Sequence, residues 1–142
     1  MSTRSKTILL VEDNPKDKAL TLRALKKQAV DVNVVVARDG VEALDYLSGS
    51  AEQSAPQLVL LDLKLPKIDG LEVLRRMRAQ PRTHFVPVVI LTSSTEDEDL
   101  LAGYALGANS YIRKPVDYNQ FAEAVRQLGL YWMALNNPAP SG

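Results

Sequence analysis

Cysteine is absent from the 142-residue sequence, which excludes disulfides, thiolate metal ligands and cysteine nucleophiles. Net charge is absent as well, because lysine plus arginine and aspartate plus glutamate both number 17. Nothing global therefore attracts the chain to nucleic acid or to an anionic membrane. No apolar run approaches the length of a membrane span or of a signal-peptide core. These absences predict a cytoplasmic protein with no nucleic-acid partner and no membrane partner.

Apolar runs and helical patterns alternate along a chain whose length suits a single domain. Strands are predicted at Thr7–Val11, Val32–Ala37, Leu58–Leu61, Val86–Leu91 and Ser110–Arg113. Helices are predicted after Pro15, after an N-cap at Asp39, over Leu71–Gln80, after a cap at Ser94–Asp97, and over Tyr118–Asn136 behind a capping box of Asp117 and Gln120.

Five strand–helix units in succession predict an α/β fold with a doubly wound, five-stranded parallel sheet. The run Leu58–Leu61 has no polar alternation, as expected of a strand with helices on both faces. We expect a disordered N-terminus over residues 1–6, one domain over residues 7–136 with an extended last helix, and a flexible tail over residues 137–142. In such sheets ligands bind at the carboxyl ends of the strands, near the switch in strand order.

Polar side chains follow the carboxyl ends of several predicted strands. Glu12 and Asp13 follow the first strand and Asp62 follows the third. Thr92 follows the fourth and Lys114 the fifth, so all five are expected at one edge of the sheet. Three crowded carboxylates repel unless a cation neutralises them, and hard oxygen ligands without histidine or cysteine favour Mg²⁺. A carboxylate in this position can attack phosphorus and become an acyl phosphate, while the metal, Lys114 and Thr92 neutralise the phosphoryl oxygens.

Each of these residues has a simpler interpretation when it is considered alone. The simpler roles are loop capping for Asp62, helix N-terminal acids for Glu12 and Asp13, a solvated surface lysine for Lys114, and ordinary strand packing for Thr92 and Tyr111. His84, the only histidine, is interpreted as a solvent-facing loop residue and not as an acid, a base or a ligand. The shared edge favours the chemical interpretation of the set.

Together these residues resemble the receiver domains of two-component response regulators, from Lys6 to about Leu128. The matching segments are ILLVEDN, LVLLDLKLPKIDG, PVVILTSS and YIRKP. The resemblance implies the flavodoxin-like (βα)5 fold and a phosphorelay switch that catalyses only its own phosphorylation and dephosphorylation. It implies a sensor histidine kinase as the source of the phosphoryl group. The implied roles are phosphoacceptor for Asp62, direct Mg²⁺ ligand for Asp13, mostly water-mediated ligand for Glu12, backbone-carbonyl ligand for Lys64, phosphate contact for Lys114, and a switch pair of Thr92 and Tyr111.

Within that family the chain resembles the small stand-alone regulators paired with bacterial phytochromes. The shared features are an N-P-K-D stretch after the acidic pair, a long loop over Ser48–Gln57, the PRTHFVPVVILTSS segment, and an aromatic pair, Tyr131 and Trp132. The resemblance implies a phytochrome-type kinase as partner. Only about a helix's worth of sequence follows Pro115, so the signal is expected to leave through contacts with another protein or another copy.

Three other classes of protein share parts of this pattern. An aspartyl-phosphate hydrolase usually carries its nucleophile after the first strand with a second aspartate two residues later, whereas Asp62 follows the third strand and residue 64 is lysine. A flavin-binding electron carrier needs a Ser/Thr/Gly-rich phosphate loop after the first strand, which this chain lacks. A pseudo-receiver that acts only by protein contacts has no need of the intact acidic triad.

The predicted last helix carries one apolar stripe, formed by Phe121, Val125, Leu128, Trp132 and Leu135. At roughly 1.5 Å per residue this helix would run about 28 Å, whereas a five-residue strand spans about 17 Å. Tyr131, Trp132 and Leu135 are therefore expected to overhang the sheet and lie in water on a monomer. The alternative is that Trp132 folds back over its own sheet edge. The stripe predicts a homodimer through the last helix and the neighbouring fourth-helix and fifth-strand face, where Tyr111 could couple phosphorylation to association.

Overall fold

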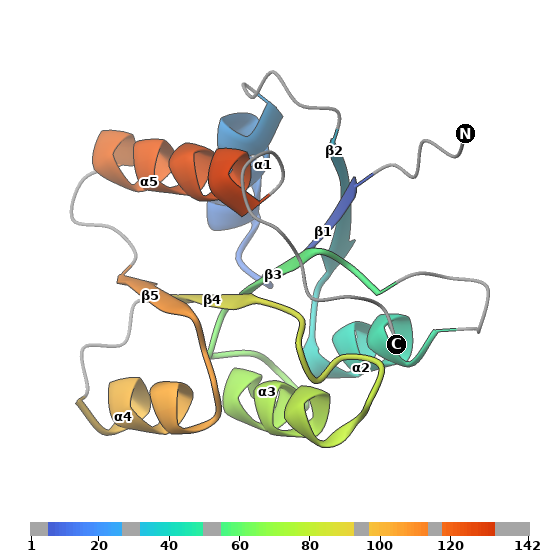
Figure 1. The fold of residues 1–142 in the computed structure, drawn as a ribbon. Helices are drawn as coiled ribbons and strands as arrows, with labels where there is room; N and C mark the ends of the chain where they lie inside the picture. The colour runs from blue at the N-terminus through green and yellow to red at the C-terminus, as the bar shows by residue number, and fades with distance from the viewer. Residues whose placement is uncertain (1–5, 27–31, 50–54, 93–96, 114–117, 133–142) are drawn as a thin grey trace, which may run out of the picture.

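The computed structural model describes residues 6–26, 32–49, 55–92, 97–113 and 118–132, in which strands and helices alternate (Figure 1). The strands are β1 (Lys6–Val11), β2 (Val32–Ala37), β3 (Leu58–Leu61), β4 (Val88–Thr92) and β5 (Ser110–Arg113). The helices are α1 (Pro15–Lys26), α2 (Gly40–Ser48), α3 (Gly70–Ala79), α4 (Asp97–Ala105) and α5 (Tyr118–Leu130). This order confirms the predicted alternation of five strands and five helices.

The five strands form one parallel sheet in the order β2-β1-β3-β4-β5. β1 lies between β2 and β3, with Leu9 opposite both Val35 and Val59. The chain passes outward from β1 to β2, then crosses back over β1 to place β3 on its other side. The switch in strand order therefore lies between β1 and β3, where such sheets bind ligands. The predicted doubly wound, flavodoxin-like fold is confirmed.

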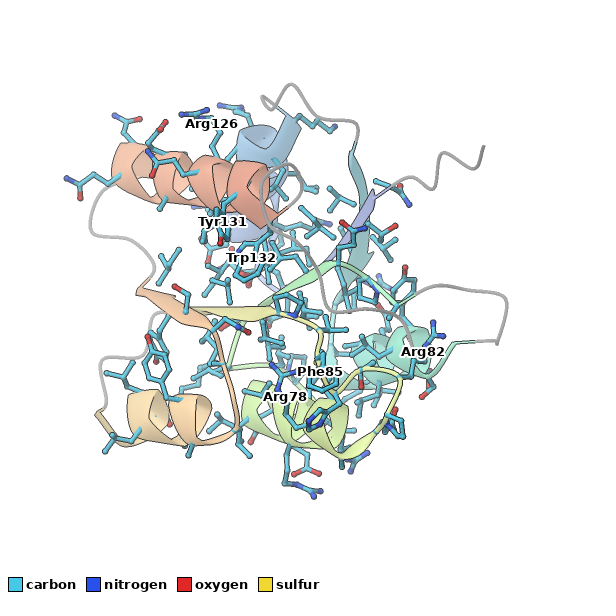
Figure 2. All side chains as sticks on the ribbon, viewed as in Figure 1. Arg78, Arg82, Phe85, Arg126, Tyr131 and Trp132 are labelled. Atoms are coloured by element: carbon cyan, nitrogen blue, oxygen red, sulfur yellow. The ribbon has the colours of Figure 1, made fainter. Side chains whose placement is uncertain are left out.

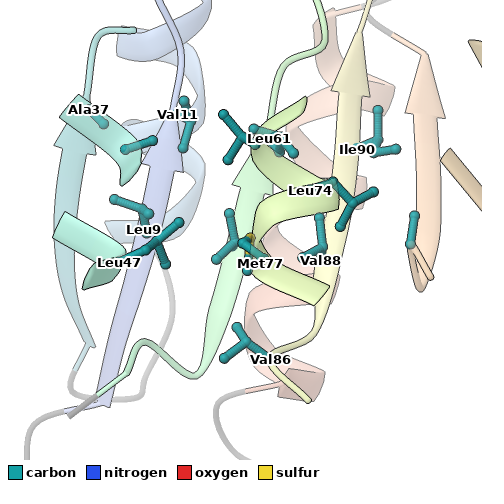
Figure 3. Packing of buried hydrophobic residues seen from close by; sticks show 14 of the residues in the cluster. Leu9, Val11, Ala37, Leu47, Leu61, Leu74, Met77, Val86, Val88 and Ile90 are labelled. Carbon is teal, nitrogen blue, oxygen red and sulfur yellow. The ribbon is translucent and has the colours of Figure 1, made fainter. Parts of the chain in front are cut away.

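Helices cover both faces of the sheet, with α1 and α5 on one face and α2, α3 and α4 on the other (Figure 1). Successive residues of a strand point to opposite faces. Ile8 and Leu10 accordingly pack with α1 and α5, whereas Leu9 and Val11 pack with α2 and α3 (Figure 3). All four residues of β3 are buried, which explains why this strand has no polar alternation.

Aspartate side chains fix the starts of two helices. The Asp39 carboxylate accepts a hydrogen bond from Glu42 N–H at 2.8 Å, which confirms the predicted N-cap of α2. Asp69 caps α3 in the same way, through Glu72 N–H at 3.0 Å. Because this cap lies next to Gly70, α3 begins one residue earlier than predicted; it also ends one residue earlier, at Ala79.

The fourth strand begins later than the sequence indicated. The apolar run suggested Val86–Leu91, but β4 spans Val88–Thr92. Pro87 has no N–H to donate to a neighbouring strand, so the regular ladder starts after it. Its carbonyl oxygen still accepts a hydrogen bond from Val59 N–H at 3.0 Å. The proline therefore marks the start of the strand.

Trp132 corrects one expectation about the last helix. Its side chain does not lie in water but is partly buried against the core cluster that contains Ile8, Leu10 and Val125. Trp132 follows Leu128 by one helical turn on the same apolar stripe, and that stripe faces the sheet. Tyr131 is 48% exposed, as expected, and its ring meets Trp132 edge-on with centroids 5.1 Å apart (Figure 2).

Several expectations concern residues outside the described part of the chain. The N-terminus was predicted to be disordered over residues 1–6; Lys6 is instead the first residue of β1, and residues 1–5 are outside the described part. The capping residues Ser94 and Asp117, the extension of the last helix with Leu135, and the tail over residues 137–142 are outside it as well. None of the helices that are described is both long enough and apolar enough to cross a membrane.

One arginine ties the loop between α3 and β4 to the turn that precedes β5 (Figure 2). Arg78 Nη1 donates hydrogen bonds to the carbonyl oxygens of His84 at 3.0 Å, Val86 at 2.9 Å and Thr83 at 3.4 Å. Its Nη2 donates to the carbonyl oxygen of Gly107 at 2.8 Å. Burial lowers the pKa of Arg78, but a guanidinium remains charged in proteins. A half-buried cation thus holds four carbonyl groups at the amino-terminal end of the sheet.

His84 is exposed, as the sequence indicated, and it belongs to the same loop. Its Nδ1 lies 2.7 Å from the carbonyl oxygen of Arg78, and its ring contacts Phe85 edge-on with centroids 4.7 Å apart. The imidazole therefore helps to shape the loop at the end of the sheet opposite the predicted site.

Replacing Arg78 with methionine should lower the free energy of unfolding by about 1–3 kcal/mol, because four carbonyl groups lose a charged donor. Urea denaturation of the purified protein measures this change. Arg76→Met is the matched control, since Arg76 pairs with Glu72 on the solvent side of α3 and its loss should cost less than about 0.5 kcal/mol. Equal losses in the two variants would contradict the role of Arg78.

Candidate functional site

Two adjacent strands deliver three carboxylates to one point. β1 ends at Val11 and β3 ends at Leu61, and these two residues lie opposite each other in the parallel register. Glu12 and Asp13 follow the first strand and Asp62 follows the second, so they leave the sheet side by side. The Asp62 N–H donates to the carbonyl oxygen of Val11 at 3.1 Å, which continues the ladder one residue beyond the strands. The backbone of the site is therefore fixed by the sheet.

The three side chains converge as predicted. Glu12, Asp13 and Asp62 each place a carboxylate oxygen within 4.8 Å of the others. Glu12 and Asp62 are buried, with 1% and 6% of their surface exposed, whereas Asp13 is exposed. Two like charges about 5 Å apart repel by roughly 3 kcal/mol at an effective dielectric constant of about 20. A cation bound among these oxygens would remove that repulsion.

The donor set fits a hard divalent cation. All three side chains offer carboxylate oxygens, which Mg²⁺ and Mn²⁺ prefer, and no cysteine exists in the chain to favour a softer metal. One of the three acids is exposed to solvent, so water could complete the coordination of a bound ion. The residues present therefore fit the metal that the sequence predicted.

Asn14 is a site residue that the sequence analysis missed. Its Oδ1 accepts hydrogen bonds from Lys16 N–H at 2.9 Å and Asp17 N–H at 3.1 Å, so Asn14 is the N-cap of α1. Its own N–H donates to Glu12 Oε2 at 3.2 Å. Because Asn14 caps the helix, Asp13 is not needed for that purpose. The signal was present in the sequence, since asparagine before a first-turn proline is a typical helix start.

Asp62 makes a local hydrogen bond as well as belonging to the carboxylate cluster. Its Oδ1 accepts from Lys64 N–H at 3.3 Å, so the simpler loop-capping interpretation is partly correct. The helix that follows is capped by Asp69 and not by Asp62. The side chain of Lys64 points to α4, where its Nζ lies 3.7 Å from Asp99 Oδ2. Only the backbone of Lys64 is thus placed near the cluster.

The remaining predicted residues lie on β4 and β5 or beyond them. Thr92 is the last residue of β4 and pairs with Arg113, so its backbone is at the carboxyl edge of the sheet. Tyr111 lies opposite Ile90 and is half-buried, with its ring centroid 6.4 Å from that of Tyr104 on α4. Lys114 lies outside the described residues. The exposed face of α4 also carries Tyr104, which the sequence analysis did not single out.

The chain belongs to the response regulator receiver domain family, whose sequence pattern it matches over residues 8–126. It is 41% identical to the probable methanogenesis regulatory protein FilR2 of Methanothrix harundinacea, and the match covers 94% of this chain and 88% of FilR2. It is 38% identical to the response regulator Rcp1 of Synechocystis, with 93% of this chain and 92% of Rcp1 covered.

Solved structures of response regulators have the same fold. The phosphorylated cyanobacterial phytochrome response regulator RcpA superposes with a TM-score of 0.89 at 38% identity, covering 96% of this chain and 100% of RcpA. The Mn²⁺-bound form of Rcp1 gives 0.87 at 35% identity, covering 95% and 99%. The bacteriophytochrome response regulator AtBRR gives 0.73 at 50% identity, covering 94% and 99%. The chain is therefore a receiver domain related to phytochrome response regulators.

Crowding of the three carboxylates should make the metal-free protein less stable than one with a charge removed. Asp62→Asn should raise the free energy of unfolding in chelator by about 1 kcal/mol, because one of three like charges has gone. The same variant should gain less stability than wild type when Mg²⁺ is added, since one carboxylate is lost from the cluster.

Thermal denaturation with chelator and with Mg²⁺ measures both effects. Asp45→Asn, on the exposed side of α2, is the control and should change stability by no more than about 0.5 kcal/mol in either condition. An Asp62→Asn protein that melts at or below the wild-type temperature in chelator would contradict the repulsion.

Proposed function

We propose that the chain is a response regulator receiver domain that accepts a phosphoryl group from a sensor histidine kinase onto Asp62 and signals through protein contacts in the cytoplasm. The observation that carries this proposal is the convergence of buried Asp62 with Glu12 and Asp13 at the switch in strand order. Membership of the receiver domain family supports it, since phosphorylation of an aspartate is general in that family.

The chemistry proposed for Asp62 is a direct phosphoryl transfer. A carboxylate oxygen of Asp62 attacks the phosphorus of a phosphohistidine, so that a P–O bond forms while the P–N bond breaks. The electron pair of the broken bond stays on the departing imidazole nitrogen. The backbone holds the nucleophile in place through the hydrogen bond from Asp62 N–H to Val11. Attack by water on the same phosphorus later restores the free carboxylate and ends the signal.

In this proposal the acidic cluster binds the metal, and residues on or after β4 and β5 contact the phosphoryl group and carry the switch. Glu12, Asp13, Asp62 and the Lys64 carbonyl would hold Mg²⁺, which supplies positive charge to the phosphoryl oxygens when it is bound. Lys114 and the Thr92 hydroxyl would contact the same oxygens after transfer. Movement of Thr92 toward the phosphoryl group would leave room for Tyr111 to turn inward. Tyr111 already packs beside the core cluster between the sheet and α3, which supports its place as the second member of the switch.

A phytochrome-type histidine kinase is the partner best supported by the relatives. RcpA and AtBRR are named as phytochrome and bacteriophytochrome response regulators, and both superpose on nearly the whole chain.

The aspartyl-phosphate hydrolase considered from sequence is not favoured, because the nucleophile follows the third strand and the residue two positions later is Lys64. The proposal therefore makes the chain a signalling switch that catalyses only its own phosphorylation and dephosphorylation.

Asp62→Asn should abolish labelling by acetyl phosphate, because an amide nearly preserves the shape of the side chain but is not a nucleophile. Mass spectrometry of the intact protein should detect the added phosphoryl group on wild type in Mg²⁺ and its loss when chelator replaces Mg²⁺. Asp45→Asn is the matched control and should be labelled like wild type. Undiminished labelling of Asp62→Asn would refute the proposed acceptor.

A homodimer through the last helix also belongs to the proposed function. Tyr131 is the exposed member of its aromatic pair, and Leu101 and Tyr104 on α4 are exposed apolar side chains at 69% and 48%. Exposed aromatic and aliphatic groups of this kind are frequent at protein interfaces. Leu135, a further member of the predicted interface, lies outside the described residues. Because Trp132 packs on its own core, Tyr131 is the better residue with which to test association.

Tyr131→Ser should shift the protein toward monomer in sedimentation velocity experiments, while leaving labelling of Asp62 unchanged. Val41→Thr, an exposed apolar residue of α2, is the control and should sediment like wild type. Wild-type protein that sediments as a monomer at high micromolar concentration, whether phosphorylated or not, would refute the dimer.

A further inference from the structure

The loop that joins β3 to α3, residues 62–69, is folded tightly against itself. Two hydrogen bonds each close a three-residue turn: Leu65 N–H donates to Leu63 O at 3.1 Å, and Ile68 N–H donates to Pro66 O at 2.9 Å. The Gly70 N–H also donates to Leu63 O, at 2.9 Å. This loop carries both the proposed acceptor and the proposed carbonyl ligand, so its shape determines the geometry of the site.

The second of these turns is centred on a strained residue. Lys67 has a φ of +69°, the only positive φ outside glycine among the described residues. Side chains disfavour this region because Cβ approaches the backbone, and turns closed over three residues with positive φ are rare. Glycine would adopt the same backbone without strain. Strain of this kind persists where the surrounding structure imposes it. A contact of the lysine side chain should therefore explain why lysine, and not glycine, occupies this position.

An ion pair with α2 supplies that reason. Lys67 Nζ lies 3.3 Å from Asp39 Oδ2, and the Asp39 side chain is only 11% exposed. Asp39 is already the N-cap of α2, through Glu42 N–H. The hydrogen bond from Glu42 and then the Lys67 ammonium hold the pKa of Asp39 below its usual range. Lys67 thus completes the pairing of a largely buried carboxylate on a neighbouring element.

Two glycines allow close backbone contacts around the loop between β3 and α3. A Cβ on Gly40, the first residue of α2, would lie 2.1 Å from the carbonyl oxygen of Ile68. A Cβ on Gly70 would lie 2.2 Å from the carbonyl oxygen of Asp62. The start of α2 therefore touches the loop beside Lys67, and Gly70, at the start of α3, touches the acceptor residue Asp62. Movement of the loop away from α2 would be transmitted to Asp62 through this packing.

We propose that Lys67 and Asp39 are a positioning pair, which holds the β3–α3 loop against α2 so that Asp62 and the Lys64 carbonyl stay in place for the metal. The inference rests on the proposed function, because it assigns the pair a task at the metal and phosphoacceptor site. Lys67 and Asp39 are not ligands themselves in this assignment. They act through the loop, as residues that orient metal ligands commonly do.

Metal affinity separates positioning from a merely structural role. Titration calorimetry with Mg²⁺ alone should give a dissociation constant about tenfold higher for Lys67→Met and for Asp39→Asn than for wild type. Asparagine still caps α2, so Asp39→Asn removes the ion pair and keeps the cap. The double variant should be no weaker than either single variant, because both remove the same interaction. Lys67→Arg should restore affinity to within about twofold, and Arg76→Met should not change it.

Lys67→Gly gives the sharpest test, because it separates the backbone from the side chain. Glycine relieves the positive φ but removes the ammonium, so the variant should melt no lower than wild type in chelator and still bind Mg²⁺ about tenfold more weakly. In metal-free protein, Lys67→Met and Lys67→Gly should speed hydrogen exchange at the amides of Leu65, Ile68 and Gly70, while the amides of β1 exchange as in wild type.

The outcomes distinguish the two levels of the proposal. Wild-type affinity in both Lys67→Met and Lys67→Gly, in a protein that binds Mg²⁺ and is labelled on Asp62, would overturn the positioning pair alone. Wild-type protein that neither binds Mg²⁺ nor accepts a phosphoryl group would overturn the proposed function and the positioning pair with it. Loss of affinity in every variant, including Arg76→Met, would show a general loss of folding and would also overturn the pair.

Discussion

The parallel pairing of β1 with β3 is the constraint on which the site depends. It places Val11 opposite Leu61, so the residues that follow must leave the sheet together. Three of those residues carry a carboxylate, and two of the three are buried. Gathering these charges costs stability, and the apolar strands beneath must offset that cost. The same crowding makes the cluster suited to a cation, whose charge would offset the repulsion.

The two ends of the sheet carry charges of opposite sign. At the amino-terminal end, the Arg78 cation is surrounded by carbonyl oxygens from the loops that precede β4 and β5. That arrangement is complete within the chain and fixes the loops. At the carboxyl-terminal end, carboxylates gather within 4.8 Å of one another, and a bound cation would remove their repulsion. One end therefore serves stability, and the other is suited to change its state when a ligand or a phosphoryl group arrives.

Much of the fold and of the acidic cluster could be predicted because local chemistry encodes them. Leu58–Leu61 shows its burial by lacking polar residues, Asp39 shows a helix start, and residues at strand ends of a parallel sheet share one edge. The start of β4 was misplaced because the apolar run continues through Pro87, whose missing N–H ends the regular pairing. Asn14 was overlooked as a cap although the proline that follows it was a usable signal.

By itself, the sequence determined the order of the elements, the sheet and the meeting of Glu12, Asp13 and Asp62, since these follow from hydrophobic pattern and chain direction. Only the tertiary structure decided where Trp132 packs, that Arg78 binds the carbonyl group of Gly107, and that Lys67 lies beside Asp39. The physical reason is distance along the chain. Those contacts join segments far apart in sequence, so they depend on how helices and loops pack in three dimensions, which no local pattern records.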